Sequence, residues 1–363
     1  MRLFTALVFF FFVEHANAQF HQPVFPGQEG QQLLDNLQGA YKPQWVLSNF
    51  TNDTIYGKIY REPDDSLRCV YTGYTVYLTP GQDPSQTAFS ANINLEHTFP
   101  KAMGSDSGLA EDDMHHLHPS RVDVNGARGN LPFGEVQDSQ ADAWFFMDQT
   151  QSNVPGAEID LYSEVINNDR FEPREDHKGN VARAMFYFYA IYKEQADQAN
   201  ATFFEAQRET LCQWHFADPV DSLEWARTFL IAGFQDDKPN PFVLDCTLPE
   251  RSFCQGLGLS CDPPSNYDPE LDLPFDAFFL HPNPGDRLVR LELVMRKKAE
   301  VTLELYDATG KKVDEMAVGE KTPGAYTLHW ENKLLPSGMY WWKLILGTES
   351  GALSTTRKMI LQH

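Results

Sequence analysis

The sequence is poor in basic residues. Its 363 residues include 29 Lys and Arg against 51 Asp and Glu, which gives a formal net charge of −22 at pH 7. Proteins that bind nucleic acid tightly are usually basic, because their cations neutralise phosphates and release counterions. The charge therefore excludes tight binding spread over the whole surface. It still allows a catalyst, which needs only a local cationic groove and divalent ions that offset part of the repulsion.

Long hydrophobic runs are also scarce. One run, residues 3–13, follows an arginine and precedes the small-residue site Ala16-Asn17-Ala18. This pattern predicts a secretory signal peptide over residues 1–18. The run is too short to cross a bilayer as a permanent helix, and no later stretch reaches its length. We therefore expect an exported protein with no transmembrane segment in its mature chain.

Cysteine is rare, and the common zinc motifs are missing. The chain has five cysteines, so at most two disulfides form and one thiol is left over. This number fits an oxidising destination but leaves the pairing open. No Cys-x-x-Cys pair and no His-Glu-x-x-His motif is present, which argues against the zinc sites that use them. The cysteines are Cys69, Cys212, Cys246, Cys254 and Cys261.

Polar chemistry is concentrated in three ordered blocks. They are residues 94–100, 113–119 and 125–134. Glu96 and Asn125 offer oxygen ligands of the kind that Mg²⁺ prefers, and that ion needs few protein ligands because it keeps several waters. His97 has an unperturbed pKa near neutral and is expected to stay off the metal and accept a proton from water. Together the blocks predict a metal-dependent cleaver of phosphodiester bonds.

The blocks read Asn-x-Glu-His-x-x-Pro, Asp-x-His-His-Leu-x-Pro and Val-Asn-Gly-x-Arg-x-Asn. In this they resemble the endonuclease I family of secreted bacterial nucleases, which carry a ββα-metal (His-Me finger) site. The resemblance makes His97 the general base, with Glu96 and Asn125 as the metal ligands. It makes Arg128 a phosphate contact. It also implies Mg²⁺, with Mn²⁺ or Ca²⁺ as alternatives, and cleavage of DNA, and of RNA as a second substrate, to 5′-phosphorylated ends.

Residues 19–255 are expected to form an α+β catalytic domain that contains this site. Residues 68–78 are rich in β-branched and aromatic side chains and predict one strand. A helix with one buried face is predicted where apolar residues recur from Val181 to Tyr192. Residues 235–242 resemble the family's closing Gln-Gly-Asn-x-Asn-Pro-Phe, with Asp-Asp in place of Gly-Asn and one residue inserted.

Residues 256–274 are a Pro- and Asp-rich linker, and residues 275–363 have a different pattern. Alternating runs separated by turn signals predict a small all-β sandwich (Ig-like) domain. Its landmarks, among them Pro282-Asn283-Pro284 and Leu335-Pro336-Ser337-Gly338, resemble the C-terminal sorting domain of type IX secretion cargo. This resemblance implies the type IX machinery as a partner and a secreted or cell-surface destination, reached through the periplasm. We expect a monomer.

Two alternatives remain open. In the first, His115, His116 and His118 are zinc ligands in a hydrolase of another class, since imidazole suits zinc. Within the resemblance, Asp113 and His115 instead support the metal and the base. In the second alternative, the protein is a non-enzymatic surface binder that uses the tryptophans of its C-terminal domain. These are Trp330, Trp341 and Trp342.

Overall fold

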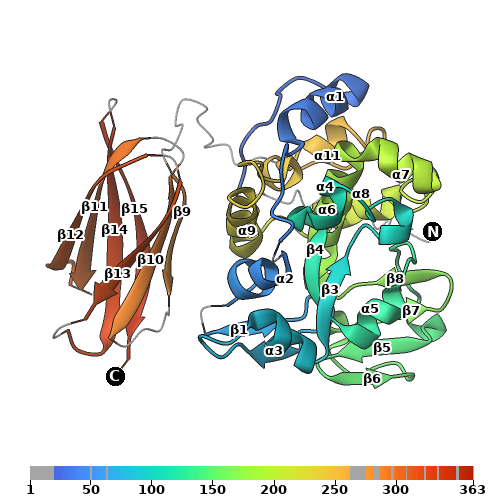
Figure 1. Ribbon diagram of the computed structural model, residues 1–363, viewed down its shortest axis with the longest axis horizontal. Helices are drawn as coiled ribbons and strands as arrows, with labels where there is room; N and C mark the ends of the chain where they lie inside the picture. The colour runs from blue at the N-terminus through green and yellow to red at the C-terminus, as the bar shows by residue number, and fades with distance from the viewer. Residues whose placement is uncertain are drawn as a thin grey trace, which may run out of the picture.

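The computed structural model describes residues 20–49, 51–62, 64–261, 275–281, 287–295, 298–307, 309–322, 324–332, 335–348 and 351–362. A mixed helix-and-strand part ends at Cys261, and an all-β part begins at Phe275 (Figure 1). This succession confirms the expected order of an α+β region and an all-β region. The predicted signal peptide, residues 262–274 of the linker and the Pro282-Asn283-Pro284 landmark lie outside the described residues. Within the described ranges, no helix is long and apolar enough to span a membrane.

The mixed part is built around helix α6, Lys178–Ile191. Every residue of α6 except Asn180 is buried. The prediction of a helix is confirmed, but the prediction of a single buried face is wrong. Other helices cover α6 on several sides, including α1 (Gly30–Tyr41), α8 (Arg208–Ala217) and α10 (Pro241–Leu244). An aromatic-rich helix of this kind can lie wholly inside because its neighbours leave it no solvent face.

The remaining helices of the mixed part are short. They are α2 Thr51–Thr54, α3 Pro84–Ser90, α4 Leu109–Asp112, α5 Val122–Arg128, α7 Lys193–Asn200, α9 Ser222–Ala232 and α11 Leu248–Arg251. The strands form two two-stranded sheets and one four-stranded sheet of order β6-β5-β7-β8. They are β1 Ser66–Arg68, β2 Thr75–Tyr77, β3 Ile93–His97, β4 Leu117–Arg121, β5 Ala143–Phe146, β6 Gln149–Gln151, β7 Ser163–Ile166 and β8 Arg170–Glu172.

The predicted strand over residues 68–78 is wrong as a single element. The chain makes two short antiparallel strands, β1 and β2, and turns between them. The Gly73 amide donates to the carbonyl of Cys69 at 2.9 Å, and Gly73 has a φ of +72°. That left-handed conformation favours glycine. Gly73 therefore sets a turn inside a sequence whose other residues favour a strand. The turn carries Tyr71 into the interior, where its side chain is fully buried.

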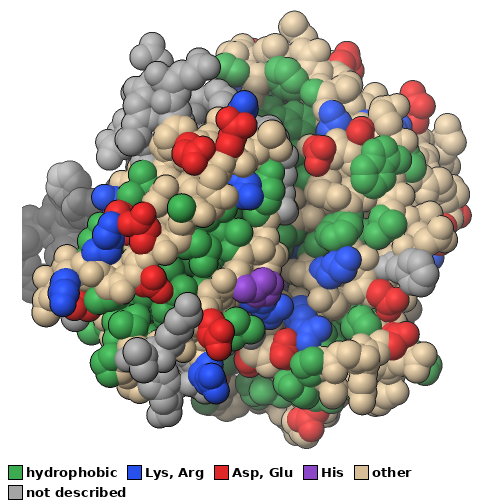
Figure 2. Space-filling view, turned by 60° about the vertical axis from the view of Figure 1, so that its left-hand side comes forward, with side chains coloured by type: hydrophobic (Ala, Val, Ile, Leu, Met, Phe, Trp, Pro, Cys, Tyr) green, Lys and Arg blue, Asp and Glu red, His purple; other side chains and the backbone are tan. Residues whose placement is uncertain are grey.

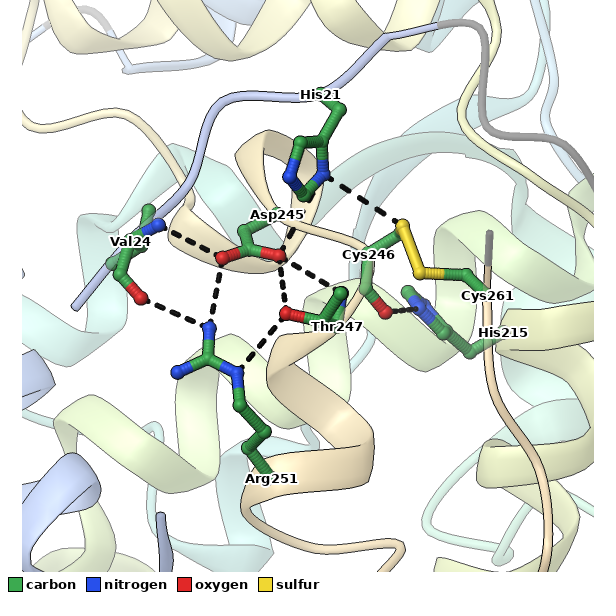
Figure 3. Close-up of a disulfide and its surroundings, with 8 residues drawn as sticks. All are labelled: His21, Val24, His215, Asp245, Cys246, Thr247, Arg251 and Cys261. Atoms are coloured by element: carbon green, nitrogen blue, oxygen red, sulfur yellow. Dashed lines mark hydrogen bonds and ion pairs between the residues drawn. A yellow bond between two sulfur atoms is a disulfide. The ribbon is translucent and has the colours of Figure 1, made fainter. Parts of the chain in front are cut away.

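Both ends of the mixed part are fastened to each other. The Val24 amide donates to Oδ2 of Asp245 at 2.8 Å, and Arg251 donates to the carbonyl of Val24 at 2.9 Å. A disulfide joins Cys246 to Cys261 beside this network, as Figure 3 shows. This disulfide ties residues 256–261 to the helical part, although the sequence predicts that they belong to the linker.

The disulfides agree with the cysteine count. The second one joins Cys212 to Cys254, and Cys69 is free and buried.

The all-β part has two sheets that share one hydrophobic core. The sheet orders are β13-β10-β9 and β12-β11-β14-β15. The strands are β9 Phe275–His281, β10 Leu288–Met295, β11 Ala299–Asp307, β12 Lys312–Lys321, β13 Gly324–Glu331, β14 Gly338–Thr348 and β15 Gly351–Leu361. Trp330 and Trp342 are both buried, with ring centroids 5.6 Å apart. Two of the three tryptophans that the surface-binder alternative uses are therefore core residues.

Two buried carboxyl groups face each other in the sheet of the mixed part. Glu164 of β7 lies opposite Glu172 of β8, and each side chain is buried. Glu172 accepts a hydrogen bond from Nζ of Lys178 at 2.7 Å. Oε2 of Glu164 is buried with no hydrogen-bond partner. Burial and, to a smaller extent, the nearby charge of Glu172 together raise the pKa of Glu164 to about 8.

We predict that Glu164→Gln stabilises the mixed part at alkaline pH. Folded Glu164 holds its proton up to a pKa of about 8, whereas its ordinary value is 4.5. The free energy of unfolding should therefore fall as pH rises between these values. Glutamine cannot ionise, so the variant should melt a few degrees higher at about pH 8.5, where each kcal/mol is worth about 2–4 °C. At about pH 4.5 the two proteins should differ little.

Differential scanning calorimetry of the transition of the mixed part measures this effect. Glu205→Gln is the matched control, because Glu205 is exposed and only forms an ion pair with Arg208 at 3.0 Å. Equal melting temperatures for Glu164→Gln and the unmodified protein at both pH values would contradict the prediction.

Candidate active site

Two strands and the helix that follows them bring the three blocks together. β3 pairs antiparallel with β4, and α5 begins directly after β4 and contacts both strands. Figure 1 shows the three elements side by side. In the ladder, Glu96 lies opposite His118 and His97 lies opposite Leu117. Because successive strand residues point to opposite faces, Glu96 and His97 leave β3 in different directions.

His97 is held with one ring nitrogen free. Its Nε2 lies 3.1 Å from the carbonyl oxygen of Glu111. A carbonyl can only accept, so Nε2 carries the proton of the neutral ring and Nδ1 keeps its lone pair. Burial lowers the pKa of His97 to about 4, and the charge of Lys101 acts in the same direction. The ring is therefore neutral near pH 7 and able to accept a proton at Nδ1.

Asn125 lies in α5 and reaches back to β3. Its Nδ2 donates to Oδ1 of Asn94 at 3.0 Å and to the carbonyl of Leu95 at 3.2 Å. The Leu95 carbonyl is an acceptor only, which assigns the nitrogen to that side of the amide. Within the described residues, Oδ1 of Asn125 accepts no hydrogen bond. The side chain is thus turned so that its oxygen is available as a ligand.

Glu96 is buried, with a carboxylate that has two partners. Its Oε1 accepts from the hydroxyl of Tyr71 at 3.0 Å and lies 3.3 Å from Nη1 of Arg128. Burial raises the pKa of Glu96 to about 7, whereas Arg128 and Tyr71 act to lower it. One carboxylate and one amide oxygen, from neighbouring elements, are a donor set that suits a hard cation.

Arg128 lies on the inside of the site, which differs from the expected phosphate contact. Its side chain has no exposed surface, and its guanidinium lies over the ring of Phe133 at 4.5 Å. The two Nη atoms donate to the carbonyls of His97 and Thr98 at 3.1 and 2.5 Å. Nε has no partner but is itself buried. In this conformation the guanidinium faces Glu96 and the backbone, where a phosphate does not reach it.

Asp113 fixes the position of the His-rich loop, residues 114–116, which lies between α4 and β4. Its Oδ2 accepts from the hydroxyl of Tyr187 in α6 at 2.8 Å and from that of Tyr192, directly after α6, at 2.7 Å. Its Oδ1 accepts from Nε2 of Gln235 and from the His115 amide. Four donors on one buried carboxylate fix the loop to the central helix.

The three histidines proposed as zinc ligands have three different partners. Nε2 of His115 bonds the carbonyl of Lys238, Nε2 of His116 bonds that of Ala110, and Nδ1 of His118 bonds Oγ1 of Thr98. Over the ranges that the structure describes, no three His, Cys, Asp or Glu side chains are placed to hold a metal ion. The ring of His116 instead packs edge-on against His97, with centroids 5.5 Å apart.

The sequence did not reveal every residue at the site. Tyr71 lies outside the three blocks, in a segment predicted to be a strand, and carries no motif. Lys101 follows the first block and is exposed, with its Nζ 2.7 Å from Oε1 of Glu111. Its position directly after the Glu-His-x-x-Pro motif was the available signal. Gln235 falls in the closing motif. Its side-chain oxygen Oε1 accepts from the backbone N–H of Met114 at 2.9 Å.

Comparison with known proteins identifies the family of the region that contains this site. The family model of endonuclease I matches residues 31–247, and that of the secretion system C-terminal sorting domain matches residues 280–362. An extracellular ribonuclease of Bacillus subtilis is 32% identical over 236 residues, which are 60% of this chain and 72% of that protein.

Two further relatives match over shorter lengths. An extracellular ribonuclease of Bacillus amyloliquefaciens is 31% identical, covering 41% of this chain and 50% of that protein. The endonuclease-1 of Buchnera aphidicola is 28% identical, covering 34% and 42%. The chain therefore spans half or less of these two relatives.

These matches define the class of protein, which is a nuclease followed by a secretion sorting domain. The chain belongs to the endonuclease I family. The sorting domain and the extracellular relatives assign it to the exported proteins, secreted or held at the cell surface.

Proposed function

We propose that this protein is a secreted, metal-dependent endonuclease that hydrolyses phosphodiester bonds without sequence preference and leaves 5′-phosphorylated ends. The observation that carries the proposal is the grouping of Glu96, His97 and Asn125 on β3 and the adjacent helix α5. Nε2 of His97 is bonded to the Glu111 carbonyl and Nδ2 of Asn125 to Asn94, which leaves Nδ1 and Oδ1 as acceptors within the described residues. DNA is the first substrate and RNA the second. The names of the relatives include both an endonuclease and extracellular ribonucleases. The protein is expected to act as a monomer.

Mg²⁺ suits the donor set that this site offers. Asn125 has its amide nitrogen occupied and its oxygen free, and both contacts of Glu96 fall on Oε1. Glu96 and Asn125 would hold the ion, and water molecules would supply its other ligands. Mn²⁺ or Ca²⁺ could occupy the same site in place of Mg²⁺. When bound, such an ion stabilises charge on the phosphate and on the departing oxygen.

His97 is the proposed general base. The carbonyl of Glu111 fixes the Nε2–H tautomer and the ring orientation, so a water at Nδ1 can lose its proton to the ring. His97 would remain off the metal. The contact of His116 with the ring further limits its rotation.

Lys101 replaces Arg128 as the proposed phosphate contact. It is exposed, and its charge acts on His97. Its partner Glu111 is also exposed, so a phosphate competes with that ion pair at little cost, because exposed ion pairs are weak.

The net charge of the chain gives little attraction to nucleic acid beyond this site. On the face drawn in Figure 2, acidic and basic side chains are interspersed. With a net charge of −22, nucleic-acid binding should be weak and should weaken further with salt.

The Mg²⁺-dependent nuclease is preferred over the two alternatives for different reasons. A zinc hydrolase would need His115, His116 and His118 to converge on one ion, and the different partners of these side chains argue against that. A non-enzymatic binder does not fit membership of a nuclease family.

We predict that His97→Ala lowers the turnover of plasmid nicking by roughly 10²- to 10⁴-fold, the usual contribution of a general base. Binding of Mn²⁺ to the variant, measured by calorimetry, should be unchanged because His97 is not a ligand. His329→Ala is the control, since His329 is an exposed histidine of β13. Nicking by His97→Ala at the unmodified rate would rule out the assignment.

We predict that Glu96→Gln and Asn125→Ala each raise the Mg²⁺ concentration for half-maximal nicking by at least about tenfold, since each removes one of few protein oxygens on the ion. Glu205→Gln should leave it unchanged. EDTA should abolish nicking by the unmodified protein. Activity that follows Zn²⁺ and ignores Mg²⁺ and Mn²⁺ would instead support the zinc hydrolase.

We predict that truncation of the mature chain after Cys261 leaves the nicking rate and the melting of the mixed part unchanged. The truncated protein retains both disulfides, and the mixed and all-β parts have separate cores. In its native host it should remain in the periplasm, because the sorting domain is gone.

Truncation after Ser260 is the matched control. It removes Cys261 and the disulfide of 15-residue separation, and the entropy of that loop is worth about 3 kcal/mol. An inactive or unfolded protein truncated after Cys261 would show that the C-terminal domain is more than an address. Normal export of the truncated protein would show that this domain is not the address.

A further inference from the structure

The carboxylate of Glu96 is held from one side. The hydroxyl of Tyr71 donates to Oε1 at 3.0 Å, and Nη1 of Arg128 lies 3.3 Å from the same oxygen. Across the part of the chain that the structure describes, Oε2 accepts no hydrogen bond. The group is therefore oriented by contacts on one oxygen, and the other oxygen is left for a ligand.

Tyr71 is fixed by its own surroundings. Its side chain is fully buried, and its ring lies 4.9 Å from that of Phe171 and 5.9 Å from that of His177. Its carbonyl accepts from Oγ of Ser163 at 2.6 Å. The hydroxyl is the donor in its bond to Glu96, because a carboxylate oxygen only accepts. The hydroxyl thus has a defined position and a defined role toward Glu96.

Arg128 connects the same carboxylate to the backbone of the site. Arg128 and Asn125 are three residues apart in α5, so both side chains reach the same strand. Asn125 bonds Asn94 and Leu95, while Arg128 bonds the carbonyls of His97 and Thr98. Helix α5 is therefore hydrogen-bonded to the chain both before and after Glu96.

We propose that Tyr71 and Arg128 are positioning residues that fix Oε1 of Glu96 and leave Oε2 to bind the divalent cation. This inference rests on the proposed function, in which Glu96 is a metal ligand. A carboxylate released from both contacts would rotate about its last bond and lose the orientation that the ion needs. Hydrogen-bond partners of metal ligands commonly contribute roughly 10- to 100-fold to metal affinity.

The test is Tyr71→Phe in the full mature protein. The substitution removes one hydroxyl and keeps the ring against Phe171 and His177. Binding of Mn²⁺ without nucleic acid, measured by calorimetry, should weaken by about 10-fold or more. The metal concentration for half-maximal nicking should rise in parallel, while KM for DNA at saturating metal should not change. A purely structural role would not produce this separation.

Tyr189→Phe is the matched control. Tyr189 is a buried residue of α6, and its hydroxyl also donates to a carboxylate, that of Asp197 in α7, at 2.8 Å. Neither residue is a partner of Glu96. The Tyr189→Phe variant should bind Mn²⁺ as the unmodified protein does. Arg128→Lys, which keeps the charge and loses the planar fork, should weaken Mn²⁺ binding further, and circular dichroism checks that it is folded.

Glu96→Gln separates the two levels of the argument. If this variant loses Mn²⁺ binding and Tyr71→Phe binds normally, the proposed function stands and the positioning role of Tyr71 is overturned. If Glu96→Gln binds Mn²⁺ normally, Glu96 is not a ligand, and both the metal assignment and the positioning role are wrong. Weakened binding in Tyr71→Phe together with loss in Glu96→Gln is the result that the geometry leads us to expect.

Discussion

The ion pair between Glu96 and Arg128 is the constraint on which the rest of the site depends. Neither side chain is appreciably exposed, and a buried carboxylate is costly unless it is both paired and hydrogen-bonded. Arg128 meets the first need and Tyr71 the second. Because Arg128 also binds the backbone after Glu96, the same interaction sets the orientation of α5 and hence of Asn125. This explains why an arginine in a nuclease motif lies inside the protein.

The second layer of the site depends on α6. Tyr187 lies in this almost wholly buried helix and Tyr192 directly follows it. Both hydroxyls donate to Asp113, so the loop of residues 114–116 is supported by the core of the mixed part. Gln235 closes the arrangement from a distant segment. A loop held in this way keeps the carbonyl of Ala110 on His116, and His116 in turn packs against His97. The contacts that limit the rotation of the His97 ring thus begin at the core.

Export and catalysis occupy separate parts of the chain, each with its own core. The disulfide between Cys246 and Cys261 lies at the end of the mixed part, where Arg251 and Asp245 also fasten the N-terminal segment. Removal of the sorting domain beyond this point would leave those ties in place. The formal net charge of −22 favours weak over tight binding of nucleic acid.

The sequence by itself determined the three ordered blocks, the family, the sorting domain and the limit of two disulfides. These rest on local spacing, which a linear pattern retains. Only the tertiary structure decided the direction of Arg128, the contact of Tyr71 with Glu96 and the bond from Gln235 to Asp113. Tyr71 and Glu96 are 25 residues apart, and Gln235 and Asp113 are 122 apart. Contacts over such separations have no periodic signature, and the turn at Gly73 that directs Tyr71 inward lies inside a stretch whose composition favours a strand.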